Sequence, residues 1–178
     1  MESMTDEHDL ERTVVLHDGT AVWLRAIRSD DDTGLVALFH RLGEQTIYQR
    51  FFAARRSLPP LWIHVLTHVD YQRRLAIVAE LDDASGPRLI GVARYDVAGA
   101  PEAAEIALVV EDAWQGRGLG TILLHAIMRA GEARGFRRFR VDVLAENRRM
   151  LRLLSRETEI VSRTTSYGVT EALVQGRR

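Results

Sequence analysis

The sequence contains no cysteine and no lysine, and each absence removes whole classes of chemistry. Without cysteine the protein has no disulfide, no thiolate zinc site and no thiol nucleophile. Without lysine it lacks the nucleoside-triphosphate loop, which needs Gly-x-x-x-x-Gly-Lys followed by Ser or Thr. All 24 basic residues are therefore arginine, and with 25 acidic residues they give a formal net charge of −1. This balance favours neither nucleic acid nor an anionic membrane as a partner.

Long apolar stretches are missing as well. No run approaches the ~20 residues of a membrane-spanning helix, and residues 1–11 are acidic and polar, unlike a secretory signal. We therefore expect a cytoplasmic protein. The 178 residues suffice for one well-buried domain and are too few for two of ordinary size. Residues 1–12 are charged and aperiodic and predict a flexible tail, which leaves 13–178 as a single domain.

Glycines are concentrated where a predicted strand passes into a predicted helix. The apolar residues 106–110 precede them, and the helical spacing of Leu123, Ile127 and Met128 follows. Backbone N–H groups at a helix N-terminus have no intrahelical partner and carry the positive end of the dipole, and glycines let an anion approach them closely. We interpret this turn as a diphosphate-binding loop. It consists of Gln115, Gly116, Arg117, Gly118, Leu119, Gly120 and Thr121.

The spacing of the glycines indicates which diphosphate. The dinucleotide fingerprint Gly-x-Gly-x-x-Gly needs a third glycine that the sequence does not provide after Gly118 and Gly120. The pattern Gln/Arg-x-x-Gly-x-Gly does fit residues 115–120. With its preceding strand and following helix, this segment resembles the acyl-coenzyme A pyrophosphate loop of the GNAT superfamily of N-acetyltransferases. The alternative is a glycine-rich turn that merely connects a strand to a helix.

Apolar periodicity and turn residues predict the remaining elements. Asp18-Gly19 marks a hairpin between two strands, and Ser29 with Asp32 suggests the N-terminal cap of a helix ending at Gly43. In chain order we expect strands at 13–16 and 21–27, helices at 30–42, 44–52 and from 59, strands at 75–81, 89–97 and 104–110 with a turn at 99–102, a helix at 118–134, a strand at 139–144, a helix from 147, and strands at 160–161 and 169–174. Short turns make three of these strands an antiparallel meander, whereas the strand at 139–144 follows a crossover helix and is expected to be parallel to its neighbour.

The GNAT resemblance implies a mixed α/β (α+β) fold with a strongly twisted central sheet of about six or seven strands and helices on both faces. Residues 48–52, Tyr-x-Arg-Phe-Phe, and residues 69–74, Val-Asp-Tyr-x-Arg-Arg, are similar to segments of one branch. That branch is the acetyltransferase domain of bacterial protein-lysine acetyltransferases of the Pat type.

The same resemblance implies a site for acetyl-coenzyme A. In the family, the strand before the glycine loop separates from its parallel neighbour and offers backbone groups to the pantetheine arm, which maps to Leu108, Val109 and Val110. Diphosphate contacts map to residues 115–121. The family's asparagine after the following strand is matched by Asn147, for which a simple helix N-cap is an equally supported interpretation.

Glu105 is the residue that we predict as the general base. Similar glutamate-bearing strands carry the base in GNAT lysine acetyltransferases. Desolvation on a largely buried strand would raise its pKa toward the working range. The alternative is an exposed strand carboxylate, because alternation places Glu105, Ala107 and Val109 on one face without orienting that face.

A general acid is not evident in the sequence. Many GNAT enzymes place a tyrosine after the asparagine, in Leu-Tyr-x-x-x-Gly-Phe, where it protonates the departing thiolate. The corresponding run here, residues 153–159, has neither the tyrosine nor the Gly-Phe. Ser155 would be only a weak substitute.

Two further groups of residues have competing interpretations. His64 and His68 lie four apart, but the glutamate and third ligand of a zinc helix are not apparent, and we predict no metal site. Arg148, Arg149 and Arg152 either meet the ribose phosphate of the cofactor or form an exposed cationic helix face.

These patterns together predict an acetyl-coenzyme A-dependent N-acetyltransferase in which an amine attacks the thioester directly, with a protein lysine as the favoured acceptor. A small-amine acetyltransferase is one alternative. A catalytically weak acyl-coenzyme A-binding regulatory module is another, suggested by the missing tyrosine and Gly-Phe. A homo-oligomer is compatible with this prediction.

Overall fold

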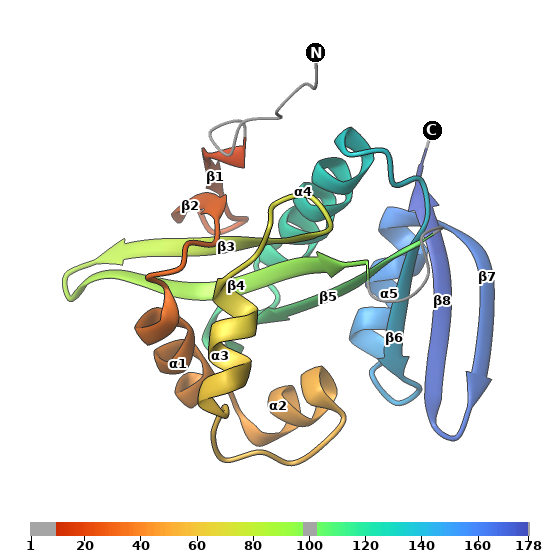
Figure 1. The fold of residues 1–178 in the computed structure, drawn as a ribbon, viewed down its shortest axis with the longest axis horizontal. Coiled ribbons are helices and arrows are strands. Elements are labelled where there is room, and N and C mark those ends of the chain that lie inside the picture. The colour runs from red at the N-terminus through yellow and green to blue at the C-terminus, as the bar shows by residue number, and fades with distance from the viewer. Residues whose placement is uncertain (1–9, 98–102, 178) are drawn as a thin grey trace.

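A mixed β-sheet of eight strands is the centre of the fold (Figure 1). The computed structural model describes residues 10–97 and 103–177. The strands are β1 Arg12–Val15, β2 Ala21–Ala26, β3 Arg74–Asp83, β4 Gly86–Asp96, β5 Ala104–Val110, β6 Phe139–Leu144, β7 Thr158–Ser166 and β8 Val169–Gly176. They lie in the order β1-β2-β3-β4-β5-β6-β8-β7, and only β5 and β6 are parallel neighbours. The predicted mixed sheet is confirmed, with eight strands rather than six or seven, because both terminal hairpins join it.

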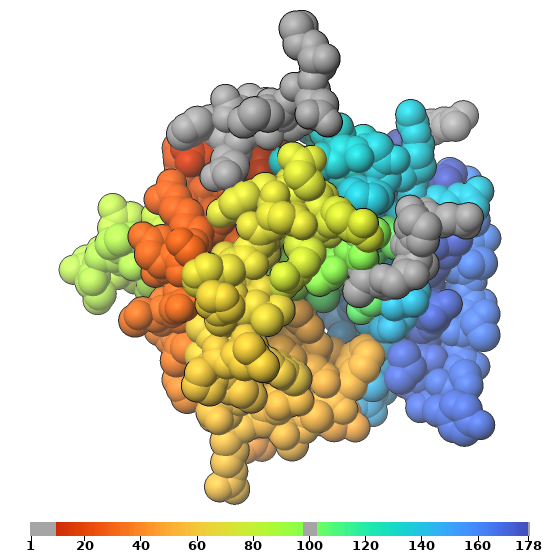
Figure 2. All heavy atoms as spheres, in the orientation of Figure 1, coloured from red at the N-terminus to blue at the C-terminus, as the bar shows by residue number. Residues whose placement is uncertain are grey.

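Helices cover both faces of this sheet. They are α1 Asp32–Arg41, α2 Glu44–Phe51, α3 Pro60–Thr67, α4 Leu119–Ala133 and α5 Arg148–Glu157, with a short 3-10 turn, η2, at Asp112–Trp114. Apolar side chains of α1, α2 and α3 form one core cluster with the sheet, and those of α4 and α5 form a second cluster on the opposite face. In Figure 2 the orange and yellow atoms of α1–α3 cover the front of the sheet, and the blue atoms of β7 and β8 form its flank.

The start of α1 differs from the prediction. Asp31, not Ser29, precedes the helix, and no side chain caps it. The carboxylate of Asp31 instead accepts two hydrogen bonds of 2.8 Å from Arg25, whose side chain is buried. A buried guanidinium needs a counter-charge more than a helix end needs a cap, because the helix end can be hydrated.

The strand β7 is longer than predicted and begins immediately after α5. Its residues from Ser162 to Ser166 are polar and exposed, so neither face carries the apolar alternation that reveals a strand in sequence. Cross-strand pairing with β8 defines it instead. Residues 1–9 of the predicted tail and the predicted turn at 99–102 lie outside the described residues, and Arg12 already belongs to β1.

No helix within the described ranges is both long and apolar enough to cross a membrane. A cytoplasmic location stays a prediction.

Candidate active site

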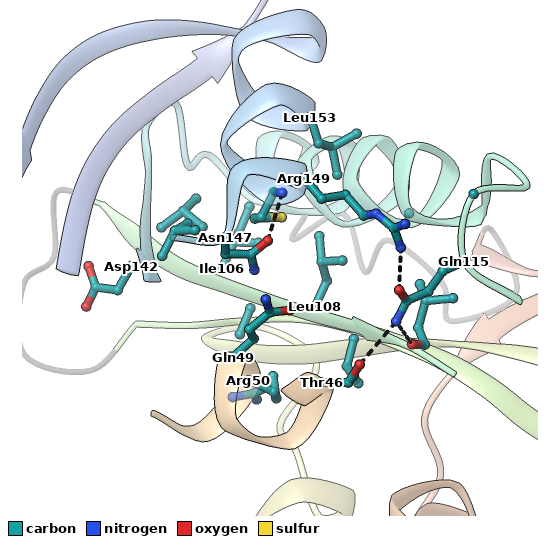
Figure 3. A pocket seen from close by; sticks show the side chains of 18 residues that line it. Thr46, Gln49, Arg50, Ile106, Leu108, Gln115, Asp142, Asn147, Arg149 and Leu153 are labelled. Atoms are coloured by element: carbon teal, nitrogen blue, oxygen red, sulfur yellow. Dashed lines mark hydrogen bonds between the residues drawn. The ribbon is translucent and has the colours of Figure 1, made fainter. Parts of the chain in front are cut away.

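A cleft opens where the two parallel strands separate. The strands β5 and β6 pair only at Ala104 with Phe139 and at Glu105 with Arg140. Beyond that point β5 continues along β4, and β6 continues along β8. The cleft between them is closed by α2 on one side and α5 on the other (Figure 3). Its lining residues are Thr46, Gln49, Arg50, Ile106, Ala107, Leu108, Val109, Val110, Gln115, Gly116, Gly120, Val141, Asp142, Val143, Asn147, Arg149, Met150 and Leu153.

The predicted residues Leu108, Val109 and Val110 all lie on this cleft. The N–H of Glu111 donates to the carbonyl of Ile90 on β4 at 2.9 Å. Backbone groups in an antiparallel pair point alternately to either side of the strand. The backbone of Val109, two residues before Glu111, therefore also faces β4, whereas the backbones of Leu108 and Val110 face away from it. The amide and carbonyl of Leu108 therefore point toward the open side of β5, where they can pair with an extended ligand.

The glycine loop forms the N-terminus of α4. Gly116 and Gly118 have φ angles of 73° and 92°, which favour glycine, and Gly118 is the N-cap residue. The first hydrogen bond of the helix is donated by Ile122 to Gly118 at 3.1 Å. The N–H groups of residues 119–121 thus lack intrahelical partners and can bind an anion. The side chain of Leu119 is buried in the core, so only its backbone is available to a ligand.

The β1–β2 hairpin supports the loop from behind. The N–H of His17 donates to the carbonyl of Arg117 at 3.0 Å, and the Arg117 guanidinium donates to Asp18 at 2.6 Å. A Cβ atom on Gly118 would lie 2.7 Å from Nε2 of His17. Glycine at 118 is therefore required by the fold as well as by any anion. The predicted cofactor contact of Arg117 rests on its backbone, because its side chain is engaged by Asp18 and the Trp114 ring.

Arginines of α5 lie beside the loop. A second hollow, continuous with the cleft through Gly116 and Gly120, is lined by both glycines and by α5. It contains His17, Gly118, Thr121, Arg149, Arg152, Leu153, Ser155 and Arg156. The sequence left open whether three arginines of α5 contact a phosphate or only form an exposed face. Arg149 and Arg152 line this hollow, beside the free N–H groups of α4, and Arg148 does not. Sequence reasoning missed Arg156, and Ser155 lies in this hollow rather than on the cleft lining.

The side chain of Gln115 connects three elements. Its amide nitrogen donates to the carbonyl of Val110 at 3.0 Å and to Thr46 of α2 at 3.3 Å, and its amide oxygen accepts from Arg149 of α5 (Figure 3). This network fixes the width of the cleft at the loop end. A direct contact of Gln115 with a cofactor stays a prediction.

Asn147 serves as the N-cap of α5. Its side-chain oxygen accepts a hydrogen bond of 3.1 Å from the N–H of Met150. This confirms the N-cap interpretation. Asn147 also lines the cleft, and since its oxygen is used for the cap, only its NH₂ group is left to donate to a ligand.

Glu105 is not among the residues that line the cleft; it lies beside the end of the cleft where β5 and β6 still pair. Because Val109 packs under α1–α3 and Glu105 shares its strand face, the carboxylate points to the α1–α3 face. Its side chain is 43% exposed and accepts a hydrogen bond of 2.5 Å from Arg140. The burial assumed in the prediction is thus absent. Its role as a base stays a prediction.

Two charged residues on the cleft were missed by the sequence analysis. Burial lowers the pKa of Arg50 on α2, which has no hydrogen-bond acceptor among the described residues. Burial, reinforced by Arg50, also lowers the pKa of the neighbouring Arg94 to about 9. Asp142 on β6 has the opposite shift: burial first, then the charges of Glu105 and Glu171, raise its pKa. Only tertiary contacts reveal these environments.

A splayed pair of parallel strands beside a glycine-rich helix N-terminus defines the acyl-coenzyme A-binding class of α/β folds. Residues 45–157 match the model of the Acetyltransferase (GNAT) family, and the chain belongs to that family. It is an acetyltransferase by family.

Characterised relatives agree with this assignment. An acetyltransferase of Pseudomonas aeruginosa is 29% identical over 76% of this chain and 73% of its own length. The acetyltransferase Pat of Mycolicibacterium smegmatis is 34% identical over 63% of this chain, but the match spans only 33% of Pat. The crystal structure of the GNAT domain of S. lividans PAT superposes with a TM-score of 0.82 at 32% identity, covering 94% of this chain and 97% of that domain. The expected resemblance to the Pat type is confirmed.

Proposed function

We propose that the protein transfers the acetyl group of acetyl-coenzyme A to a primary amine, with a protein lysine as the favoured acceptor. The observation that carries the proposal is the continuity of the cleft with the N-terminus of α4. Gly116 and Gly120 line both the cleft and the arginine-rich hollow. One extended ligand can therefore place its diphosphate at the helix end and its thioester along β5.

The residues of the chain divide the binding of this ligand between them. The N–H groups of residues 119–121, with Arg149 and Arg152, would hold the phosphates. The backbone of Leu108 would pair with an amide of the pantetheine arm. In that position the thioester would lie near the end of the cleft that Asp142 lines and that Glu105 adjoins, where the amine would arrive.

Direct attack requires a neutral amine, so a carboxylate at this end must accept the ammonium proton. Glu105 is the carboxylate indicated by sequence. In order to act, it must release Arg140, which donates to it at 2.5 Å.

The protein-lysine acceptor is proposed from the resemblance to the Pat type, and the acetyltransferase Pat of Mycolicibacterium smegmatis is a longer protein, of which the match spans 33%. A small amine is the second candidate, because α2 and the half-buried Arg50 form one side of the cleft. A regulatory acyl-coenzyme A-binding module is the candidate from another class.

A turnover assay separates the three functions. The purified protein would be incubated with acetyl-coenzyme A and a panel of lysine-containing peptides, free amino acids and polyamines, with calorimetric cofactor affinity measured in parallel. Faster acetylation of peptides than of small amines is expected. Tight binding of acetyl-coenzyme A without turnover of any amine would refute the enzymatic proposal and favour the regulatory module.

A further inference from the structure

Asp142 lies at the end of the cleft opposite Gln115 (Figure 3). Its neighbours Val141 and Val143 belong to the core under α4, so alternation points Asp142 and Arg140 to the α1–α3 face. That is also the face of Glu105. Strand register places Asp142 directly opposite Glu171 of β8. Three carboxylates from three neighbouring strands thus surround one arginine.

The hydrogen bonds within this group are uneven. Arg140 donates to Glu105 at 2.5 Å, whereas its Nε lies 3.9 Å from Oδ1 of Asp142, beyond hydrogen-bonding distance. Both Nε and Oδ1 are buried and have no hydrogen-bond partner within the described part of the chain. A buried acceptor and a buried donor that both lack a partner are unusual in a native protein, and here they show that Arg140 does not satisfy Asp142 while it is bonded to Glu105.

The charges that act on Asp142 favour proton uptake. Burial raises its pKa most, Glu105 and Glu171 raise it further, and Arg140 opposes them. A carboxylate whose pKa lies nearer to neutrality is a more effective general base. Arg50 on α2 lines the same cleft; burial lowers its pKa, and the charge that acts on this pKa is that of Glu105. Asp142 therefore combines a place on the cleft lining, a carboxylate that Arg140 leaves unsatisfied and an environment that disfavours its charge.

We propose that Asp142 is a further catalytic residue of the acetyl transfer: it binds the ammonium group of the acceptor and takes up one of its protons, while Glu105 holds Arg140 away from it. The inference rests on the proposed function. The neutral nitrogen then attacks the thioester carbon, a C–N bond forms and the C–S bond breaks. The departing thiolate receives a proton from the attacking nitrogen, and Asp142 later releases its proton to water.

The variant Glu105→Gln alone does not distinguish Asp142 from Glu105 as the base. Once freed, Arg140 is expected to turn to Asp142, 3.9 Å away, and to stabilise its charged form. Turnover then falls whichever carboxylate is the base. The double variant Glu105→Gln with Arg140→Gln does distinguish them, because it removes both the pair and the competing cation.

The experiment measures kcat and KM from pH 6 to 10 with the best amine acceptor, together with acetyl-coenzyme A affinity by calorimetry. We expect Asp142→Asn to lower kcat at neutral pH by about 10²- to 10⁴-fold with unchanged cofactor affinity, and the defect to shrink as pH rises and the amine arrives neutral. The double variant should regain much of the turnover that Glu105→Gln loses. An active Asp142→Asn variant, or a double variant as inactive as Glu105→Gln, would overturn the inference and leave Glu105 as the base.

Glu171→Gln is the matched control. It removes a carboxylate of the same group that does not line the cleft, and since Glu171 acts on Asp142 only through its charge, it should lower kcat far less than Asp142→Asn does. A loss equal to that of Asp142→Asn would mean that the net charge of the group matters rather than Asp142, and would refute the assignment. Absence of turnover in the wild type with every amine would instead overturn the proposed function itself, and the assigned role of Asp142 with it.

Discussion

Replacing Gly120 by leucine tests the cofactor site without disturbing the fold. Gly120 is the second residue of α4 and lines both the cleft and the arginine-rich hollow. A Cβ atom there meets only Cδ2 of Leu153, at the ordinary contact distance of 3.8 Å. Leucine also has a higher helix propensity than glycine, so the unliganded variant should be at least as stable as the wild type. Its side chain would, however, occupy the space in front of the helix N-terminus.

The expected magnitude follows from the bonds that are blocked. A hydrogen bond to a charged group contributes about 1.5–3 kcal/mol, and about 1.4 kcal/mol corresponds to a tenfold change in Kd. Preventing one phosphate oxygen from reaching the N–H groups of residues 119–121 should therefore weaken acetyl-coenzyme A binding by roughly ten- to a hundredfold. Titration calorimetry measures this directly.

Two controls accompany the measurement. Gly120→Ala adds a single methyl group and should have a much smaller effect, and thermal unfolding without ligand checks that Gly120→Leu is folded. A folded Gly120→Leu variant with wild-type affinity would show that the diphosphate does not bind at this helix end. Gly118 is less suitable for the test, because a substitution there strains the backbone and collides with His17.

Three further outcomes are expected. Acetyl-coenzyme A, but not NAD or ATP, should raise the midpoint temperature of thermal unfolding, because a ligand at 100 times its Kd adds about 2.7 kcal/mol to the free energy of unfolding. An equal shift with NAD would restore the dinucleotide interpretation of the glycine loop. Asp31→Ala leaves buried Arg25 with Glu80 and the Ala26 carbonyl as acceptors and should cost about 2–3 kcal/mol in urea unfolding at pH 7. Burial alone would raise the pKa of Asp31, but hydrogen bonds from Arg25 and from the Arg28 N–H lower it. The contribution of Asp31 to stability is therefore complete above about pH 4, the ordinary pKa, and is lost as the pH falls through the lowered value. A stability difference between variant and wild type that does not shrink as the pH falls below the ordinary pKa would contradict this. Gly131→Ala places a Cβ atom 2.6 Å from the buried ring of Phe139 and should cost about 1–3 kcal/mol, so an unchanged urea midpoint would show that the helix and sheet adjust freely.

Local sequence determined the parts of this protein that depend on local chemistry. The Asp18-Gly19 hairpin, the prolines that begin α3 and the glycines at the start of α4 are all placed by backbone preferences of residues adjacent in the chain. The parallel direction of β6 followed from the crossover helix before it. These features sufficed for the family and the position of the glycine loop.

Tertiary structure decided which charged side chains meet. The ion pair of Glu105 with Arg140 joins residues 35 positions apart. The close approach of His17 to Gly118 brings the β1–β2 hairpin against the N-terminus of α4. No periodicity encodes such pairs, because alternation gives the face of a strand but not its neighbours. The same limit applies to Asp142, whose sequence context is an ordinary strand. Whether its oxygen Oδ1 finds a hydrogen-bond partner depends on side chains of neighbouring strands, and strand pairing between distant segments also sets where β5 separates from β6.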